Sequence, residues 1–205
     1  MKLYFSPGAC SLAPHIVLEE LGLKYEGVKV DLRNKPQELL KANPKGYVPV
    51  LELDDGKVLT EAQVILQYLA DQKPEKHLLP KMGTWERYQA MELLNFLSTE
   101  VHKGFGPLWH LKELATTPEG MEHVRAVTIR TLSKKFDFLA SILKKQPFLL
   151  GDRFSACDAY LVTLLGWTRL LKVDLTPWPE LMGYVEKAPQ IPCVQSAMRA
   201  EGLMK

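Results

Sequence analysis

The chain has 205 residues, a length that fits one large domain or two small ones and is enough to bury a hydrophobic core. Hydrophobic residues make up 46% and charged residues 24%, as in an ordinary soluble globular protein. The formal net charge is +2 and no basic cluster is interleaved with aromatic residues. The composition therefore gives no support for a nucleic-acid-binding surface.

The cysteines and the apolar segments restrict the compartment. We recognise no signal peptide, and no apolar run approaches the roughly 20 residues that span a bilayer. The three cysteines, Cys10, Cys157 and Cys193, form no CxxC pair and fit a reducing cytoplasm better than a disulfide framework. The five histidines show no metal-ligand spacing, so we expect a cytoplasmic protein with no metal site and no membrane contact.

The first 73 residues predict a small α/β domain. Its elements are a strand at 3–5, a helix at 12–22, a strand at 25–30, a short helix at 36–41, a hairpin of 48–53 and 57–60, and a helix at 61–70. The hairpin is predicted because Asp54, Asp55 and Gly56 form a strong turn signal. The order β-α-β-α-β-β-α is that of a thioredoxin-like domain.

The remaining residues predict a linker and a second, all-helical domain. Residues 74–84 are polar and proline-containing, which is typical of an interdomain linker. The helices expected in residues 85–205 span 85–114 with a bend near 104–107, then 121–143, 155–171, 179–186 and 194–200.

Cys10 is the strongest candidate for a chemical role. It lies in the turn Ser6-Pro7-Gly8-Ala9-Cys10, between a predicted strand and the start of a predicted helix. Unpaired backbone N–H groups and the positive end of a helix dipole both favour a thiolate over a thiol. We therefore expect Cys10 to be accessible, with a pKa below that of a free thiol. The alternative is a small buried residue.

Cys157 also precedes a predicted helix and serves as an internal comparison. Ser155 and Asp158 form an S-x-x-D capping pattern around it, and the neighbouring carboxylate opposes a thiolate. We expect Cys157 to be buried and structural, and the same for Cys193 beside Pro192.

Pro49 and Glu61 allow two interpretations each. Pro49 begins a predicted strand, either as an ordinary edge proline or after a cis peptide that turns Val48 toward a peptide-like ligand. Glu61 opens a helix, where it either complements the helix dipole or binds an ammonium group while backbone N–H groups bind a carboxylate.

A polar stripe follows one face of the first helix of the second domain. Asn95, Thr99 and His102 fall at i, i+4 and i+7. The stripe is either a solvated helix face or part of a site in which His102 and Lys103 donate hydrogen bonds to a thiolate.

These segments together resemble the cytosolic glutathione S-transferases, and most of all the bacterial beta class. The motifs that carry the resemblance are Ser6-Pro7-Gly8-Ala9-Cys10-Ser11-Leu12, Asn43-Pro44-Lys45-Gly46-Tyr47-Val48-Pro49-Val50-Leu51, Leu59-Thr60-Glu61, Asn95-Phe96, Glu100-Val101-His102-Lys103-Gly104, and Gly151 to Tyr160. They span nearly the whole chain in the order found in that family.

The resemblance implies a thioredoxin-like domain followed by an all-α domain, a homodimer, and glutathione as co-substrate rather than a bound cofactor. It implies that the Val48–Pro49 peptide is cis and that Cys10 contacts the glutathione sulfur. The implied glutathione-binding set is Cys10, Lys35, Val48, Glu61, Ala62, Asn95, Thr99, Glu100 and His102. The resemblance leaves open which of the last four residues reach across from the partner subunit.

The expected function is conjugation of the glutathione thiol to apolar electrophiles, with thiol–disulfide exchange through a Cys10–glutathione mixed disulfide. Cys10 and His102 are the expected catalytic residues, and Tyr4, Ser11 and Lys103 could support them. Phe105, Leu108 and Trp109 are expected to line the electrophile pocket. The alternatives are a glutathione-dependent isomerase, dehalogenase or disulfide reductase on the same fold, or a non-catalytic binder.

Overall fold

The computed structural model describes residues 1–204 and begins with an α/β unit built on a four-stranded sheet. Its elements are β1 (Lys2–Phe5), α1 (Leu12–Leu21), β2 (Glu26–Lys29), α2 (Gln37–Ala42), β3 (Val50–Glu52), β4 (Val58–Thr60) and α3 (Ala62–Gln72). The strand order is β2-β1-β3-β4, in which β1 is parallel to β2 and antiparallel to β3, and β3 is antiparallel to β4. The thioredoxin-like order and the predicted hairpin are confirmed.

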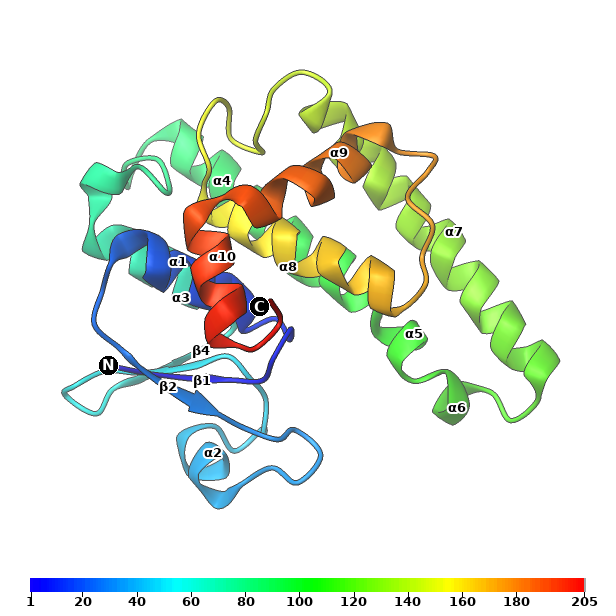
Figure 1. Ribbon diagram of the computed structural model, residues 1–205, viewed down its shortest axis with the longest axis horizontal. Helices are drawn as coiled ribbons and strands as arrows, with labels where there is room; N and C mark the ends of the chain where they lie inside the picture. The colour runs from blue at the N-terminus through cyan, green and yellow to red at the C-terminus, as the bar shows by residue number, and fades with distance from the viewer. Residues whose placement is uncertain (205) are drawn as a thin grey trace.

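The two faces of the sheet bury different sets of side chains. Figure 1 shows α1 and α3 on one side of the sheet and α2 on the other. Leu3 and Phe5 of β1 belong to the large core on the α1 side, whereas Tyr4 belongs to a small cluster with Val50 and Leu39 on the α2 side. Successive side chains of a strand point to opposite faces, so this division follows from the sequence order.

The second part of the described chain is helical. Its elements are α4 (Trp85–Phe96), a π-helical segment (Leu97–His102), α5 (Gly106–Trp109), α6 (Leu111–Leu114), α7 (Pro118–Leu143), α8 (Ala156–Leu170), α9 (Pro179–Lys187) and α10 (Pro192–Ala200), with 3₁₀ turns at Pro74–Lys76 and Ala188–Gln190. In Figure 1, α8 lies in the middle of this part, α7 runs along its outer side, and α10 lies beside α1. The predicted helical stretch at 85–114 and its break near 104–107 are confirmed, since the chain turns at Phe105, but the π-helical segment after Phe96 and the second break at His110 were not predicted.

The segment between α3 and α4 is held by specific contacts. Arg87 of α4 donates two hydrogen bonds of 2.9 Å to the Asp71 carboxylate of α3 and a third, of 3.2 Å, to the Pro80 carbonyl. Ala156 at the start of α8 donates to the Leu78 carbonyl at 2.9 Å. The sheet unit and the helical part therefore share one continuous core, in which α1 is packed between the sheet and α8.

Cys157 and Cys193 are buried, as predicted, with exposed fractions of 0% and 4%. The capping pattern at the start of α8 is also confirmed, since Ser155 and Asp158 cap one another's backbone N–H groups.

Candidate active site

A cavity of about 1250 Å³ opens between the α/β unit and the helical part. One wall is formed by the turn before α1, the segment around Val48 and the start of α3, and the other by α8 and the segment after α4. This volume exceeds the roughly 300–1,000 Å³ of a typical small-molecule site, so there is room for more than one ligand.

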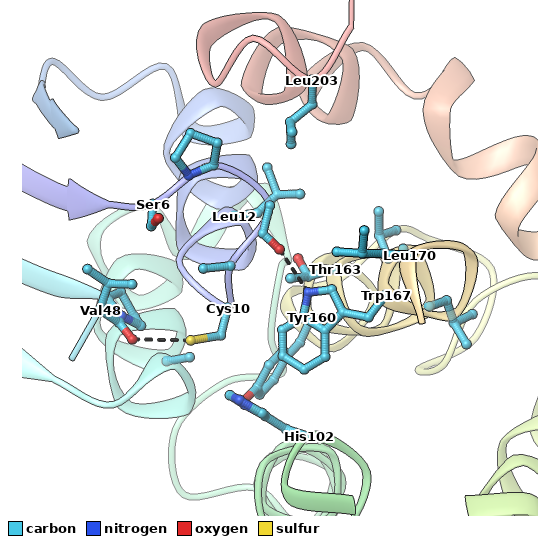
Figure 2. A pocket seen from close by; sticks show the side chains of 18 of the residues that line it. Ser6, Cys10, Leu12, Val48, His102, Tyr160, Thr163, Trp167, Leu170 and Leu203 are labelled. Atoms are coloured by element: carbon cyan, nitrogen blue, oxygen red, sulfur yellow. Dashed lines mark hydrogen bonds between the residues drawn. The ribbon is translucent and has the colours of Figure 1, made fainter. Parts of the chain in front are cut away.

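Cys10 lies in this cavity at the end of the turn before α1. Its thiol donates a hydrogen bond of 3.1 Å to the Val48 carbonyl, drawn as a dashed line in Figure 2. The Val48–Pro49 peptide is cis, which decides between the two interpretations of Pro49. Cys10 is partly exposed, unlike the two other cysteines. Cys10 is therefore not fully buried, and its chemical role stays a prediction.

The expected low pKa of Cys10 is wrong for the ligand-free protein. Burial raises the pKa of this thiol to about 12, although the backbone N–H groups of Cys10 and Ser11 and the charge of Lys103 all lower it. The helix-start effect thus exists, but desolvation outweighs it. Glu61 adds a smaller unfavourable contribution because its carboxylate repels a thiolate.

Tyr4 and Ser11 do not line the cavity, which corrects the prediction that their hydroxyls support the thiol; only the backbone N–H of Ser11 does so. Tyr4 is 2% exposed on the α2 side of the sheet, where its hydroxyl donates to Glu52 at 2.8 Å. Ser11 is fully buried, and its hydroxyl closes the turn by donating to the Ser6 carbonyl at 3.3 Å. Both side chains stabilise the surroundings of the site without reaching the cavity.

Glu61 and Ala62 form a second polar corner of the cavity at the start of α3. Glu61 has φ of +70° and ψ of 117°, a backbone conformation that a residue other than glycine adopts only when its surroundings enforce it. Its carboxylate lies 2.6 Å from Lys45 Nζ, and both side chains are exposed. The first N–H groups of α3 and the Glu61 carboxylate together suit a zwitterionic group.

His102 and Lys103 reach the cavity from the end of the π-helical segment. His102 Nδ1 lies 2.8 Å from the Tyr160 hydroxyl. Burial, and to a lesser degree the charge of Lys103, lower the pKa of His102 to about 4. His102 is therefore a neutral hydrogen-bonding group at pH 7, and Lys103 supplies the positive charge. Insertions of π-helix are frequent at functional sites.

Asn95, Thr99 and Glu100 lie outside the cavity. Asn95 accepts a 3.4 Å hydrogen bond from Gln63, Thr99 donates to the Asn95 carbonyl at 3.0 Å, and Glu100 pairs with Lys135 at 2.9 Å. All three side chains are exposed, and their predicted contact with the ligand, within one chain or across a dimer interface, stays a prediction.

Lys35 is exposed at the edge of the site. Its Nζ lies 5.4 Å from the centre of the Tyr47 ring, and Tyr47 lines the cavity. Its predicted contact with a ligand carboxylate stays a prediction.

The predicted electrophile pocket is only partly correct. Trp109 lines the cavity, but Phe105 and Leu108 are 0% and 5% exposed and pack into the core behind it. The aromatic ring that faces the cavity in front of them belongs to Trp167, whose ring centre lies 5.6 Å from that of Phe105 and 5.8 Å from that of Trp109.

Sequence reasoning missed the contribution of α8. Tyr160, Thr163, Trp167 and Leu170 follow one another at helical spacing and all line the cavity (Figure 2). Trp167 donates its indole N–H to the Gly8 carbonyl at 2.8 Å, and the Gly8 N–H donates to Glu201 at 2.8 Å. The turn that carries Cys10 is thus held from both sides by the helical part. The i, i+3, i+7 and i+10 spacing of the four α8 residues is the signal in the sequence that could have placed them on one helix face.

Residues 1–204 show neither a membrane-spanning helix nor a cluster of metal ligands. None of the helices is both long and apolar enough to cross a membrane. No group of three or more His, Cys, Asp or Glu side chains within that range is arranged to hold a metal ion.

Comparison with known proteins identifies the family. Family models for the glutathione S-transferase N-terminal and C-terminal domains match residues 3–77 and 122–187. Glutathione S-transferase GstA of Escherichia coli O157:H7 is 41% identical over 207 residues, and the match covers 99% of this chain and 100% of that protein. The chain belongs to the glutathione S-transferase family.

Solved structures extend the similarity to the whole fold of this glutathione transferase. A bacterial beta class glutathione S-transferase from Sphingomonas chungbukensis is 40% identical, with a TM-score of 0.90 and 100% of each chain covered. A sphingomonad glutathione S-transferase complexed with glutathione is 40% identical, with a TM-score of 0.89 over 99% of this chain and 100% of that one. The predicted family, fold and use of glutathione as co-substrate are confirmed.

Proposed function

We propose that glutathione binds along the cavity wall formed by the α/β unit, with its sulfur beside Cys10. The γ-glutamyl ammonium pairs with the Glu61 carboxylate, and its carboxylate takes the free N–H groups at Ala62. The backbone of Val48 pairs with the middle of the peptide, and Lys35 reaches the glycyl carboxylate. The observation that carries this assignment is that the cavity brings Cys10, Val48 and Glu61 together from three separate turns.

The main reaction is attack of the glutathione thiolate on an apolar electrophile. A free thiol has a pKa of about 8.5, so only a few per cent is ionised at pH 7. Lys103, the neutral His102 and the helix-start N–H groups beside Cys10 all favour a bound thiolate. The Cys10 thiol adds one weak donor, which it uses on the Val48 carbonyl in the ligand-free protein.

Trp109 and Trp167 form an apolar wall next to this sulfur position. Apolar, aromatic-lined space suits a hydrophobic acceptor and excludes water from the thiolate. The electrophile's reactive atom takes the sulfur's electron pair, and its leaving group departs with its own bonding pair.

Thiol–disulfide exchange is the slower activity. The Cys10 thiolate attacks the glutathione sulfur of a mixed disulfide, the S–S bond breaks, and the other thiolate leaves. A second glutathione thiolate then attacks the Cys10–glutathione disulfide, which regenerates Cys10 and releases oxidised glutathione. Because burial raises the pKa of Cys10 to about 12, its thiolate is scarce at pH 7 until a ligand alters its surroundings.

The functional unit is a homodimer. Exposed apolar side chains lie on α4 and α3, where Trp85, Tyr88 and Val64 are 72%, 56% and 40% exposed. Asn95 and Thr99 lie on the same helical stretch, so a second subunit on this surface would reach the exposed polar stripe. The three free cysteines fit a reducing cytoplasm. Analytical ultracentrifugation should give twice the chain mass, and Trp85→Glu should give the chain mass.

Initial rates with a chlorodinitrobenzene-type electrophile and with a glutathione mixed disulfide test the proposed order of activities. The purified protein should turn over the electrophile faster at pH 7. A faster disulfide reaction would make the protein a reductase on the same fold. Binding of glutathione without turnover of either class would make it a non-catalytic binder.

A further inference from the structure

The cavity wall opposite Cys10 carries a hydrogen-bonded pair that the binding mode above does not explain. The Tyr160 hydroxyl of α8 and His102 Nδ1 are 2.8 Å apart, and their rings meet edge to face at 87°. Figure 2 shows the His102 ring against the hydroxyl end of Tyr160. Tyr160 is 1% exposed, so its hydroxyl is fixed where it stands.

The protonation states determine which atom of this pair donates. Burial raises the pKa of Tyr160 far above neutrality, so its phenol keeps the proton at pH 7. Burial lowers the pKa of His102 to about 4, so the imidazole is neutral and carries one proton. Ser98, which lines the same cavity, lowers the pKa of Tyr160 by a smaller amount than burial raises it. The phenol therefore has a proton to donate, and the neutral imidazole has one unprotonated nitrogen that can accept it.

The other ring nitrogen is open to the cavity. His102 Nε2 has no hydrogen-bond partner among residues 1–204. It is not fully buried either, because Arg87 Nε is the only fully buried side-chain nitrogen or oxygen in that range that lacks a partner. Nε2 is therefore accessible. Trp167 packs its edge against the ring at 4.8 Å and 72°, which restricts rotation of the imidazole.

The charged and titratable groups around the pair do not replace the Tyr160 hydroxyl as the hydrogen-bond partner of His102 Nδ1. Cys10 comes from the turn before α1, Glu61 from the start of α3, and Lys103 from the residue after His102. Lys103 lowers and Glu61 raises the pKa of His102 through their charges alone. The Tyr160 hydroxyl is the described group that bonds an imidazole nitrogen directly.

We propose that Tyr160 is a positioning residue: its hydroxyl donates to His102 Nδ1 and holds the imidazole in the tautomer whose Nε2–H points into the cavity, toward the sulfur of bound glutathione. This inference rests on the proposed position of glutathione. In the opposite tautomer a nitrogen lone pair would face the thiolate and repel it. The hydrogen bond made by one ring nitrogen generally decides which nitrogen carries the proton.

Nitrogen-15 NMR of histidine-labelled protein at pH 7, without ligand, tests the tautomer directly. Wild type should show an unprotonated Nδ1 and a protonated Nε2 at His102. Tyr160→Phe should show a mixture of tautomers or a protonated Nδ1. The wild-type spectrum alone decides which ring nitrogen carries the proton, so the test does not depend on Tyr160→Phe folding.

The catalytic consequence is measured by the pH dependence of thiolate formation in bound glutathione. Thiolate absorbance of the complex should report a pKa about one unit higher in Tyr160→Phe than in wild type, which corresponds to a tenfold loss at pH 7. The value of kcat/KM should fall about tenfold. Tyr184→Phe is the matched control, because it removes another buried hydroxyl that bonds α8, the one that donates to Asp158 at 2.9 Å. It should lower thermal stability and leave the His102 tautomer and the thiolate pKa unchanged.

A protonated Nδ1 in wild type, or a tautomer and thiolate pKa that Tyr160→Phe leaves unchanged, would overturn the role of Tyr160. Calorimetric titration separates this failure from failure of the proposed function. If wild type does not bind glutathione, the proposed position of glutathione fails, whereas the ligand-free NMR result still decides the tautomer.

Discussion

The chain places a cysteine at the start of two helices, α1 and α8, and uses the two positions differently. At α8, Ser155 accepts from the Asp158 N–H and Asp158 accepts from the Ser155 N–H, so the helix end is satisfied internally. At α1, the Ser11 side chain caps no N–H of its own helix, and the N–H groups of Cys10 and Ser11 act on the Cys10 sulfur instead. A helix start becomes a binding site when its donors are left free.

Neighbouring charges widen the difference. Burial raises the pKa of both thiols. The charge with the largest effect on Cys10 is that of Lys103, which lowers its pKa, whereas the charge of Asp158 raises the pKa of Cys157 further. Only the first of these thiols lines the cavity. Substitutions at the two helix starts and around them should therefore have different effects on activity and stability.

Exchanging the two cysteines for alanine should give opposite results. Cys10→Ala should abolish disulfide exchange, by at least about 1,000-fold, because no mixed disulfide can form. Conjugation should fall less than about tenfold, because a thiol is a weak donor. Cys157→Ala should keep both activities and lose about 1 kcal/mol of unfolding free energy, because it leaves a small cavity. The measurements are the two rate assays and urea unfolding. Loss of disulfide exchange in Cys157→Ala would contradict the different roles assigned to Cys10 and Cys157.

Asp158→Ala should cause the largest loss of stability. It leaves the Leu149 and Ser155 N–H groups and the Tyr184 hydroxyl without a buried acceptor. We expect a loss of about 3–5 kcal/mol and a melting temperature lower by on the order of 10 °C, measured by circular dichroism. A change below about 1 kcal/mol would show that the capping box is dispensable.

The stability that Asp158 contributes should depend on pH. Its folded-state pKa is raised by burial from 3.8 to about 6. The folded state then holds the proton more tightly, so this contribution is full below the ordinary pKa and is lost as the pH rises through 6. Wild type should gain up to about 3 kcal/mol relative to Asp158→Asn between pH 7 and pH 4. Parallel unfolding curves for the two proteins at all pH values would contradict this.

Glu61→Gln should weaken glutathione binding about tenfold, because a charge-assisted hydrogen bond to the ligand's ammonium becomes a neutral one. The value of kcat should change little, since this contact is remote from the sulfur. A glutathione analogue without the α-amino group is the matched control, and it should bind both proteins equally in calorimetry. Equal weakening for both ligands would place the ammonium elsewhere.

Tyr4→Phe should have the smallest effect on activity. Its hydroxyl bonds Glu52 and Glu38 on the α2 side of the sheet, away from the cavity. We expect kcat/KM to stay within about twofold and stability to fall by about 1 kcal/mol. A tenfold loss of kcat/KM with unchanged stability would return Tyr4 to the catalytic set.

Local signals in the sequence predicted the elements, but they could not predict the burial of the site. The hairpin followed from the Asp54-Asp55-Gly56 turn, and the cap at Ser155 from its spacing to Asp158. The side chosen by Tyr4 was also readable, because it alternates with the core residues Leu3 and Phe5. The π-helical segment after Phe96 was not readable, because its hydrophobic pattern continues that of α4. Phe105 and Trp109 are both apolar, and only packing against Trp167 decides which one faces the cavity.

The most direct test of the account is the rate at which oxidised glutathione adds to each cysteine, measured by peptide mass spectrometry across pH 7–9. The account predicts an adduct on Cys10 and none on Cys157 or Cys193, with a rate that rises about tenfold per pH unit because the reacting thiolate is scarce. An adduct on Cys157 or Cys193 instead, or a Cys10 rate independent of pH, would contradict it.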